Sequence, residues 1–189
     1  MSLRDLFTQR LETGAQLAAS LLSRIDEIVA LAQLVSERLE DGATLYTCGN
    51  GGSAEQAMHL AEELVGRYRA DRAPQRAICL NADPATLTCI ANDFGFDHVF
   101  SRQCRALLTE RDVLLVLSTS GNSANLVQAL QTAREKGAAT FSLLGKHGGA
   151  CRCLCDRALL IDSEDAAHIQ EAHLAIIHLI CEAVERRLR

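Results

Sequence analysis

Apolar residues recur every three to four positions through residues 3–40, in two successive segments. The positions that share this period are Leu3, Leu6, Phe7, Leu11, Ala15 and Ala18, followed by Ile25, Ile28, Val29, Ala32, Val35 and Leu39. The period predicts two amphipathic helices, and Asp41-Gly42 ends the second because glycine readily adopts the left-handed backbone of a helix C-terminus. Two long amphipathic helices need a surface to cover, so we expect them to pack in a homo-oligomer.

Short apolar runs alternate with helical periods through the rest of the chain. The expected strands lie at 45–48, 77–80, 112–117, 140–144 and 158–161. The expected helices lie at 53–64, 87–91 (one turn), 99–108, 124–136 and 166–187. This alternation implies a parallel sheet with right-handed crossovers. About five strands predict a flavodoxin-like α/β fold, a three-layer α/β/α sandwich, in one domain over 1–189 with N-terminal helices at 1–42 and the α/β core at 43–189.

A glycine turn, Gly49-Asn50-Gly51-Gly52, joins the first expected strand to a helix. We expect Ser53 to be the N-cap of this helix, because its hydroxyl can accept a bond from the first turn. Such a turn gathers backbone N–H groups and the positive end of the helix dipole, which favours phosphate. It lacks the Gly-Lys-Ser/Thr ending of a nucleoside triphosphate loop and the third glycine of a dinucleotide loop. A plain tight turn is the alternative interpretation.

A second polar loop, STSGNS at 118–123, follows the most apolar expected strand and precedes a helix. Its hydroxyl groups belong to Ser118, Thr119, Ser120 and Ser123. These hydroxyls exceed what a helix cap requires, so we interpret the loop as a phosphate site, with a capped polar turn as the alternative. Both polar loops follow the carboxyl ends of expected strands, where open α/β sheets bind ligands.

Composition and charge limit the kinds of ligand and the cellular compartment that we expect for this chain. The chain has 189 residues, a formal net charge of −5 and 4% aromatic residues without tryptophan, which disfavours a nucleic-acid surface. No basic-then-apolar leader opens the sequence, and no apolar run approaches the ~18 residues of a membrane span, so we expect a cytoplasmic chain. The eight cysteines include the alternating set at 151–155, which lacks zinc-ribbon spacing, and we expect reduced thiols.

Candidate acid–base and metal-binding residues lie on two expected helices. His59 and Glu63 are four positions apart, so they share one face of the helix after the glycine turn. They could form a pair of metal ligands, and an exposed ion pair is the alternative. Gln170, His173 and His178 lie on the last helix, where a histidine on an apolar face is usually a core residue.

In combination, these segments resemble the SIS (sugar isomerase) domain family, in its branch of enzymes that act on a phosphorylated seven-carbon sugar. The segments that carry the resemblance are CGNGGS at 48–53, MHLAEELVGRYR at 58–69, ANDFGF at 91–96, STSGNS at 118–123, AREKG at 133–137 and IQEAHLAIIH at 169–178. The resemblance covers essentially the whole chain and implies a flavodoxin-like homotetramer with sites near subunit interfaces. It also implies conversion of D-sedoheptulose 7-phosphate to D-glycero-D-manno-heptose 7-phosphate, which feeds heptose and lipopolysaccharide synthesis in bacteria.

The same resemblance implies roles for individual residues. The implied phosphate contacts are Ser118, Thr119, Ser120 and Ser123. The implied contacts with the rest of the substrate are Asn50, Gly51, Gly52, Ser53, Glu63, Asn92, Asp93 and Gln170. The implied acid–base pair is Glu63 and His178, and the zinc ligands of some members correspond to His59, Glu63, Gln170 and His178. One departure is Ala167-His168, where some members have Asp-Arg, so a charge contact that those relatives use is missing here.

The residue types fit a ketose–aldose isomerase without a nucleotide cofactor. The reaction moves a proton between adjacent carbons through an enediol(ate), so it needs a base at carbon and an acid at oxygen. Glu63 suits the first role and His178 the second, while bound zinc would polarise the carbonyl but make Glu63 a poorer base. The alternatives are an isomerase of another sugar phosphate, or a non-catalytic SIS-domain protein that binds sugar phosphates or associates with a bacterial replication initiator. The presence of both Glu63 and His178 favours the enzyme.

Overall fold

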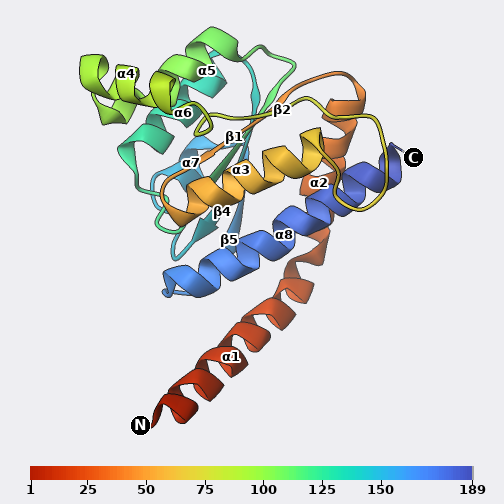
Figure 1. Cartoon of the computed structure of the whole chain (residues 1–189), viewed down its shortest axis with the longest axis vertical. Helices are drawn as coiled ribbons and strands as arrows, with labels where there is room; N and C mark the ends of the chain where they lie inside the picture. Colours follow the sequence, from red (N-terminus) through yellow and green to blue (C-terminus); the bar gives the residue numbers. More distant parts are fainter. Residues whose placement is uncertain (189) are drawn as a thin grey trace.

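A five-stranded parallel sheet forms the centre of the computed structural model, which describes residues 1–188 (Figure 1). Its strands are β1 (Leu45–Gly49), β2 (Ala77–Cys79), β3 (Val113–Ser118), β4 (Ala139–Gly145) and β5 (Arg157–Ile161). They lie in the order β2-β1-β3-β4-β5, and each neighbouring pair is parallel. This order confirms the predicted flavodoxin-like fold, whose ligand-binding edge lies where the strand order reverses, between β1 and β3.

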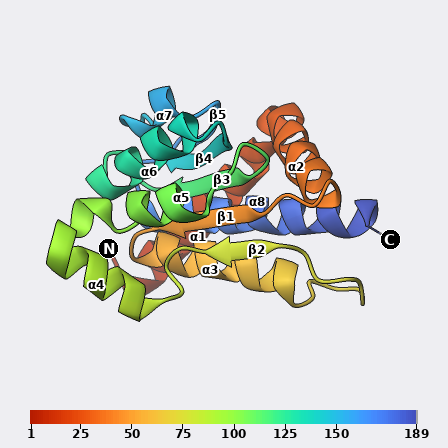
Figure 2. The same cartoon turned by 90° about the horizontal axis from the view of Figure 1, so that it is seen from above.

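Helices cover both faces of the sheet. Those found among residues 1–188 are α1 (Leu3–Ser20), α2 (Ile25–Glu40), α3 (Gly52–Val65), α4 (Pro84–Phe94), α5 (Ser101–Leu107), α6 (Ala124–Glu135), α7 (Cys151–Leu154) and α8 (Ala166–Arg187), with 3₁₀ turns η1 (Leu21–Arg24) and η2 (Phe96–His98). One core contains side chains of α2, α3 and α8, and the other contains side chains of α4 to α7. Figure 2 shows α2 and the end of α8 together, at the opposite end of the molecule from α4. The three predicted layers are therefore present.

The side chains of β3 alternate between the two cores. Leu115 and Leu117 pack with α2, α3 and α8, whereas Leu114 and Val116 pack with α5 and α6. All six residues of β3 are buried. An inner parallel strand covered on both faces requires a continuous apolar run, which explains why the sequence identified this strand most clearly.

Helix α4 is longer than the single turn expected at 87–91. Asp83 caps its start by accepting two backbone N–H bonds, and Pro84 fits the first turn, so the helix begins earlier than the apolar period suggested. The helix also continues further, so Asn92 and Asp93, expected to follow the helical turn, lie in its last turn.

Glycines lie at the ends of several helices, and at the start of α3 the observed glycine differs from the predicted N-cap. Gly51 occupies the N-cap position of α3 with φ +56°, and the helix begins at Gly52, so the prediction of Ser53 as N-cap was wrong. Only glycine adopts this left-handed backbone without strain, which lets the helix start before the serine. Gly42 and Gly137 follow α2 and α6 with φ of 79° and 75°, and the end of α2 at Gly42 was predicted.

Helix α1 extends away from the sheet, and none of its residues is buried (Figure 1). Its apolar side chains include Phe7, which is 59% exposed, and Leu11, which is 75% exposed. Arg10 attaches it to the start of α8 through an ion pair with Asp165, at 2.8 Å between Nη1 and Oδ2. The use of 1–42 for oligomerisation stays a prediction, and residue 189 of the expected domain lies outside the described residues. Within the described chain, no helix has the length and apolar character to span a membrane.

Candidate active site

A pair of asparagines joins the glycine turn to the first turn of α6, directly after the loop at 118–123. Nδ2 of Asn50 donates to Oδ1 of Asn125 at 2.9 Å, and Nδ2 of Asn125 returns a bond of 2.9 Å to Oδ1 of Asn50. Asn50 lies in the turn after β1, and Asn125 lies in the first turn of α6 and is 2% exposed. The reciprocal bonds fix the glycine turn beside the loop at 118–123. Sequence reasoning missed Asn125, because only its pairing distinguishes it from any polar residue near a helix start.

The loop at 118–123 leaves part of its hydroxyl set uncommitted. Oγ of Ser118 accepts the backbone N–H of Gly121 at 2.9 Å, and Oγ of Ser120 accepts that of Asn122 at 3.3 Å. Ser123 stands at the N-cap of α6, yet its hydroxyl makes no capping bond in the described structure. The capping alternative therefore does not account for Ser123. Its hydroxyl and the helix N-terminus remain suited to an anion.

Residues 148–151 support this loop from outside. The backbone N–H of Cys151 donates to the carbonyl oxygen of Gly121 at 2.9 Å, and that of Ala150 donates to Oδ1 of Asn122 at 3.0 Å. Gly121 has φ +66°, and a Cβ added there would clash with the carbonyl oxygen of Gly148. Glycine is thus required at 121 both for its backbone conformation and for this close approach.

Gln170 of α8 lies at the start of α3. A Cβ added at Gly52 would lie 2.6 Å from Nε2 of Gln170, and the backbone oxygen of Gln170 accepts a bond of 2.6 Å from Gln56. Asn81, another residue that sequence reasoning missed, holds Gly49 at the end of β1 through bonds to its N–H (3.2 Å) and its carbonyl (2.9 Å). Side chains from α6 and from the segment after β2 therefore hold the glycine turn, and the side chain of Gln170 from α8 lies against Gly52.

Asn92 and Asp93 are exposed on the last turn of α4. Nδ2 of Asn92 donates to Oδ1 of Asp93 at 2.7 Å, and the thiol of Cys89 donates to Asp93 at 3.7 Å. Their described bonds are thus local to α4. Contact between these two residues and a sugar stays a prediction.

His59, Glu63 and His178 form a second cluster, where α3 packs against α8. Nε2 of His59 lies 3.2 Å from Nε2 of His178 and 3.6 Å from Oε1 of Glu63. One ligand atom from each of the three side chains lies within 4.8 Å of the others. Tetrahedral zinc with bonds of about 2.0–2.1 Å places neighbouring ligand atoms roughly 3.3 Å apart, so the two imidazoles already have the spacing that one ion requires. These three side chains therefore fit a metal ion.

The fourth expected metal ligand, Gln170, lies further along α8 from this cluster, and its binding to the same ion stays a prediction. A helix rises about 1.5 Å per residue, so His178 lies about 12 Å along α8 from Gln170. Glu63 likewise lies about 16 Å along α3 from Gly52. The chain thus carries two separate groups, the polar loops with Gln170 and the cluster of His59, Glu63 and His178.

His173, between these two groups on α8, is a core residue. It is fully buried, and neither ring nitrogen has a hydrogen-bond partner among residues 1–188. Desolvation lowers the pKa of His173 to about 4, and the nearby backbone of Leu144 offsets this only in part. Burial likewise raises the pKa of Cys104, Cys151 and Cys181 to about 12, so these thiols are poor nucleophiles.

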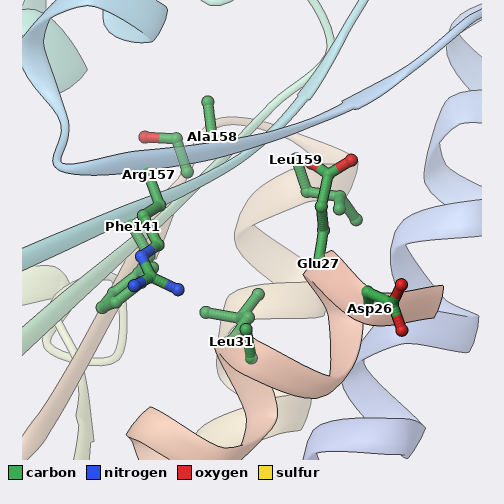
Figure 3. A pocket seen from close by; sticks show the side chains of 9 residues that line it. Asp26, Glu27, Leu31, Phe141, Arg157, Ala158 and Leu159 are labelled. Carbon is green, nitrogen blue, oxygen red and sulfur yellow. The ribbon is translucent and has the colours of Figure 1, made fainter. Parts of the chain in front are cut away.

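A cavity of about 430 Å³ lies elsewhere, between α2 and strands β4 and β5 (Figure 3). Figure 3 shows Phe141 and Arg157 side by side, facing Leu31, with Asp26 and Glu27 on the helix. None of the candidate site residues lines this cavity. The polar loops and the His59–Glu63–His178 cluster therefore remain the candidate site.

Comparison with known proteins agrees with this geometry. The sequence profile of the SIS domain matches residues 12–145. A phosphoheptose isomerase of Campylobacter concisus is 41% identical over 99% of this chain and 99% of its own, and one of Pelobacter propionicus is 52% identical over 83% and 82%. The structure of a phosphoheptose isomerase from Francisella tularensis superposes with a TM-score of 0.95 at 32% identity, covering 98% of this chain and all of that one.

Proposed function

From the premise that this chain belongs to the SIS domain family, among its phosphoheptose isomerases, we propose that it converts D-sedoheptulose 7-phosphate to D-glycero-D-manno-heptose 7-phosphate. The observation that carries the mechanism is the meeting of Glu63 and His178, from α3 and α8, beside His59. A carboxylate and an imidazole at one point supply the base and the acid that the reaction needs.

Substrate binding begins at the polar loops. The hydroxyls of Ser118, Thr119, Ser120 and Ser123, with the N-terminus of α6, hold the phosphoryl group. The remaining substrate contacts come from Asn50, Gly51, Gly52, Ser53, Asn92, Asp93 and Gln170. The uncommitted hydroxyl of Ser123 and the position of Gln170 beside Gly52 support this assignment.

Proton transfer uses the second cluster. Glu63 removes a proton from C1 of the ketose, the electron pair forms the C1–C2 double bond of the enediol(ate), and the proton is returned to C2. His178 donates a proton to the C2 oxygen as the carbonyl opens and accepts the hydroxyl proton at C1 as the aldehyde forms. A zinc ion held by His59, Glu63 and His178 would act as a Lewis acid that polarises the carbonyl.

We propose further that each active site combines two subunits. An extended chain of single bonds advances about 3.5 Å per three bonds. In the open-chain sugar substrate, the seven bonds from C2 to phosphorus therefore span at most about 8 Å. The glycine turn is bonded to the start of α6, where the phosphate is proposed to bind, and Glu63 lies about 16 Å along α3 from that turn in its own chain, roughly twice that reach. The loops of one subunit therefore receive Glu63 and His178 from another, and Gln170 can approach the histidine cluster only across this interface.

The unpartnered apolar surface of the chain supports such an assembly. Exposed Leu3, Phe7 and Leu11 line α1, and a mainly apolar groove of about 610 Å³ lies between α2 and α8. Apolar helical surface of this extent is typical of a subunit interface. We therefore assign residues 1–42 to contacts within a homotetramer.

Activity on the substrate tests the proposed function directly. Purified protein incubated with D-sedoheptulose 7-phosphate should yield the aldose, and absence of product with and without added zinc would reject the function. Glu63→Gln and His178→Gln should each lower kcat by at least about 100-fold, the usual contribution of a general acid or base. Glu55→Gln, an exposed carboxylate on the same helix, is the matched control and should be unaffected.

Complementation between subunits tests the composite site. Ser123→Asp keeps a good N-cap but places a negative charge at the phosphate position, so this variant should be inactive alone, as should Glu63→Gln. If sites combine two subunits, random co-assembly of the two variants leaves about one quarter of the sites intact and restores that share of activity. If all groups belong to one chain, the co-assembled protein stays inactive.

A further inference from the structure

The segment 66–76, called the strap below, connects α3 to β2 without regular secondary structure and passes beside the histidine cluster. Within the strap, the ring of Tyr68 stacks on the imidazole of His178, with centroids 5.8 Å apart and an interplanar angle of 28°. His178 in turn meets the ring of His59 edge-on, at 5.4 Å and 74°. One aromatic ring outside the predicted site thus contacts the acid–base cluster directly.

The position of Tyr68 is fixed from its own segment. The guanidinium of Arg69 lies 4.9 Å from the centroid of the Tyr68 ring and pairs with Glu182 of α8 at 2.8 Å. The buried carboxylate of Glu185 accepts the backbone N–H groups of Arg69 at 2.7 Å and Ala70 at 2.9 Å. Carboxylate bonds to backbone N–H groups are among the stronger hydrogen bonds, so the residues after Tyr68 are held to α8.

The strap is also hydrogen-bonded to the helix that carries Glu63. Nη2 of Arg72 donates to the backbone oxygen of Glu63 at 2.7 Å, and Nη1 donates to that of Leu64 at 2.9 Å. These bonds satisfy carbonyl groups at the C-terminus of α3, which has no further intrahelical partners for them. The same short segment therefore contacts both members of the acid–base pair, through a ring on one side and a guanidinium on the other.

We propose that Tyr68 is a positioning residue, which holds the imidazole of His178 so that its Nε2 faces His59 and Glu63. This inference rests on the proposed function only for its effect on catalysis, since the stack itself concerns the protein alone. An imidazole on a helix can rotate about two side-chain torsions, and stacking on a fixed ring removes alternative orientations. The aromatic ring of Tyr68, and not its hydroxyl, performs this role.

Two substitutions at position 68 separate the ring from the hydroxyl. Tyr68→Phe keeps the ring and should retain wild-type kcat, whereas Tyr68→Leu should lower kcat by about 3- to 10-fold, the range expected for an aromatic pair. KM should change little, because Tyr68 acts on His178 and not on the substrate. Asp71→Asn, an exposed change in the same strap, is the matched control.

Two measurements apart from turnover test the stack itself. In Tyr68→Leu, but not in Tyr68→Phe, the ring C–H resonances of His178 should shift in a carbon–proton NMR spectrum, because the ring current of Tyr68 is lost. The dissociation constant for zinc alone should rise by about 3- to 10-fold in the leucine variant, because a freer imidazole is a less organised ligand. If wild-type protein lacks isomerase activity, the proposed function fails while these two measurements still decide the role of Tyr68.

A remote pair of variants keeps the test valid if Tyr68→Leu folds poorly. Glu185→Leu removes the acceptor for the strap but leaves Tyr68 intact, and Glu185→Gln retains an acceptor oxygen. The leucine variant should reproduce the shift of the His178 resonances in part, and the glutamine variant should not. Unshifted resonances and unchanged kcat in Tyr68→Leu, or equal losses in Tyr68→Leu and Tyr68→Phe, would overturn the proposal.

Discussion

Acidification from pH 7 to pH 5 should destabilise the folded chain through His173. The pKa of this buried imidazole is about 4 in the folded state, whereas an unfolded histidine titrates near 6.5. The unfolded state therefore binds the extra proton first, and stability falls as pH drops below about 6.5. At pH 5 the loss is about 2 kcal/mol, and it approaches about 3 kcal/mol near pH 4, below which the folded state also takes up the proton.

Urea unfolding at pH 7 and pH 5 measures this loss, at fixed protein concentration because assembly also contributes to stability. His173→Leu removes the titrating group, so between pH 7 and pH 5 wild type should lose about 2 kcal/mol more unfolding free energy than the variant. In thermal unfolding, this corresponds to about 4–8 °C for a chain of this size. His147→Asn, at an exposed histidine, should follow wild type. If wild type and His173→Leu lose stability equally on acidification, the assigned pKa of His173 is wrong.

Three further changes test the site and the assembly. Gly52→Ala should raise KM more than it lowers kcat, because the new Cβ displaces the amide of Gln170. Steady-state kinetics measure both constants, and an unchanged KM would show that Gln170 does not bind the substrate. Asn125→Leu leaves the Asn50 amide without its partner, so calorimetry should show a free energy of unfolding lower by about 1–3 kcal/mol. The variant should also bind inorganic phosphate more weakly, and unchanged phosphate binding would contradict the coupling of the two loops. Phe7→Asp should shift the proposed tetramer to smaller species in light scattering while Gln16→Asp does not, and an unchanged assembly would exclude α1 from the interface.

Most of the fold could be predicted because its signals are local. The apolar run of β3, the glycines that end α2 and α6, and the period of α8 each depend on a few neighbouring residues. The predicted helix boundaries were wrong where a single residue shifted the start or end of a helix. A glycine with positive φ at position 51 moved the start of α3 ahead of Ser53, and a cap at Asp83 lengthened α4.

The candidate site could be predicted in its residue types but not in its arrangement. His59 and Glu63 share a helix face by spacing alone, whereas the approach of His178 depends on how α8 packs against α3. The Asn50–Asn125 pair and the strap contacts of Tyr68 join residues far apart in the sequence, so no local pattern signals them. The separation of about 12 Å along α8 between Gln170 and His178 could have been read from their eight-residue spacing on one helix.

The exposed helix α1 should make the activity of the proposed assembly depend on protein concentration. None of the 18 residues of α1 is fully buried in its own chain, and an isolated helix has little stability in water, so in the proposed assembly neighbouring copies would supply most of its order. Diluting the enzyme should consequently unwind this arm, seen as a drop in ellipticity at the helix wavelength, and turnover per subunit should fall at the same concentrations. If each active site combines two subunits as proposed, a cell that makes too little of this chain would contain folded but inactive subunits.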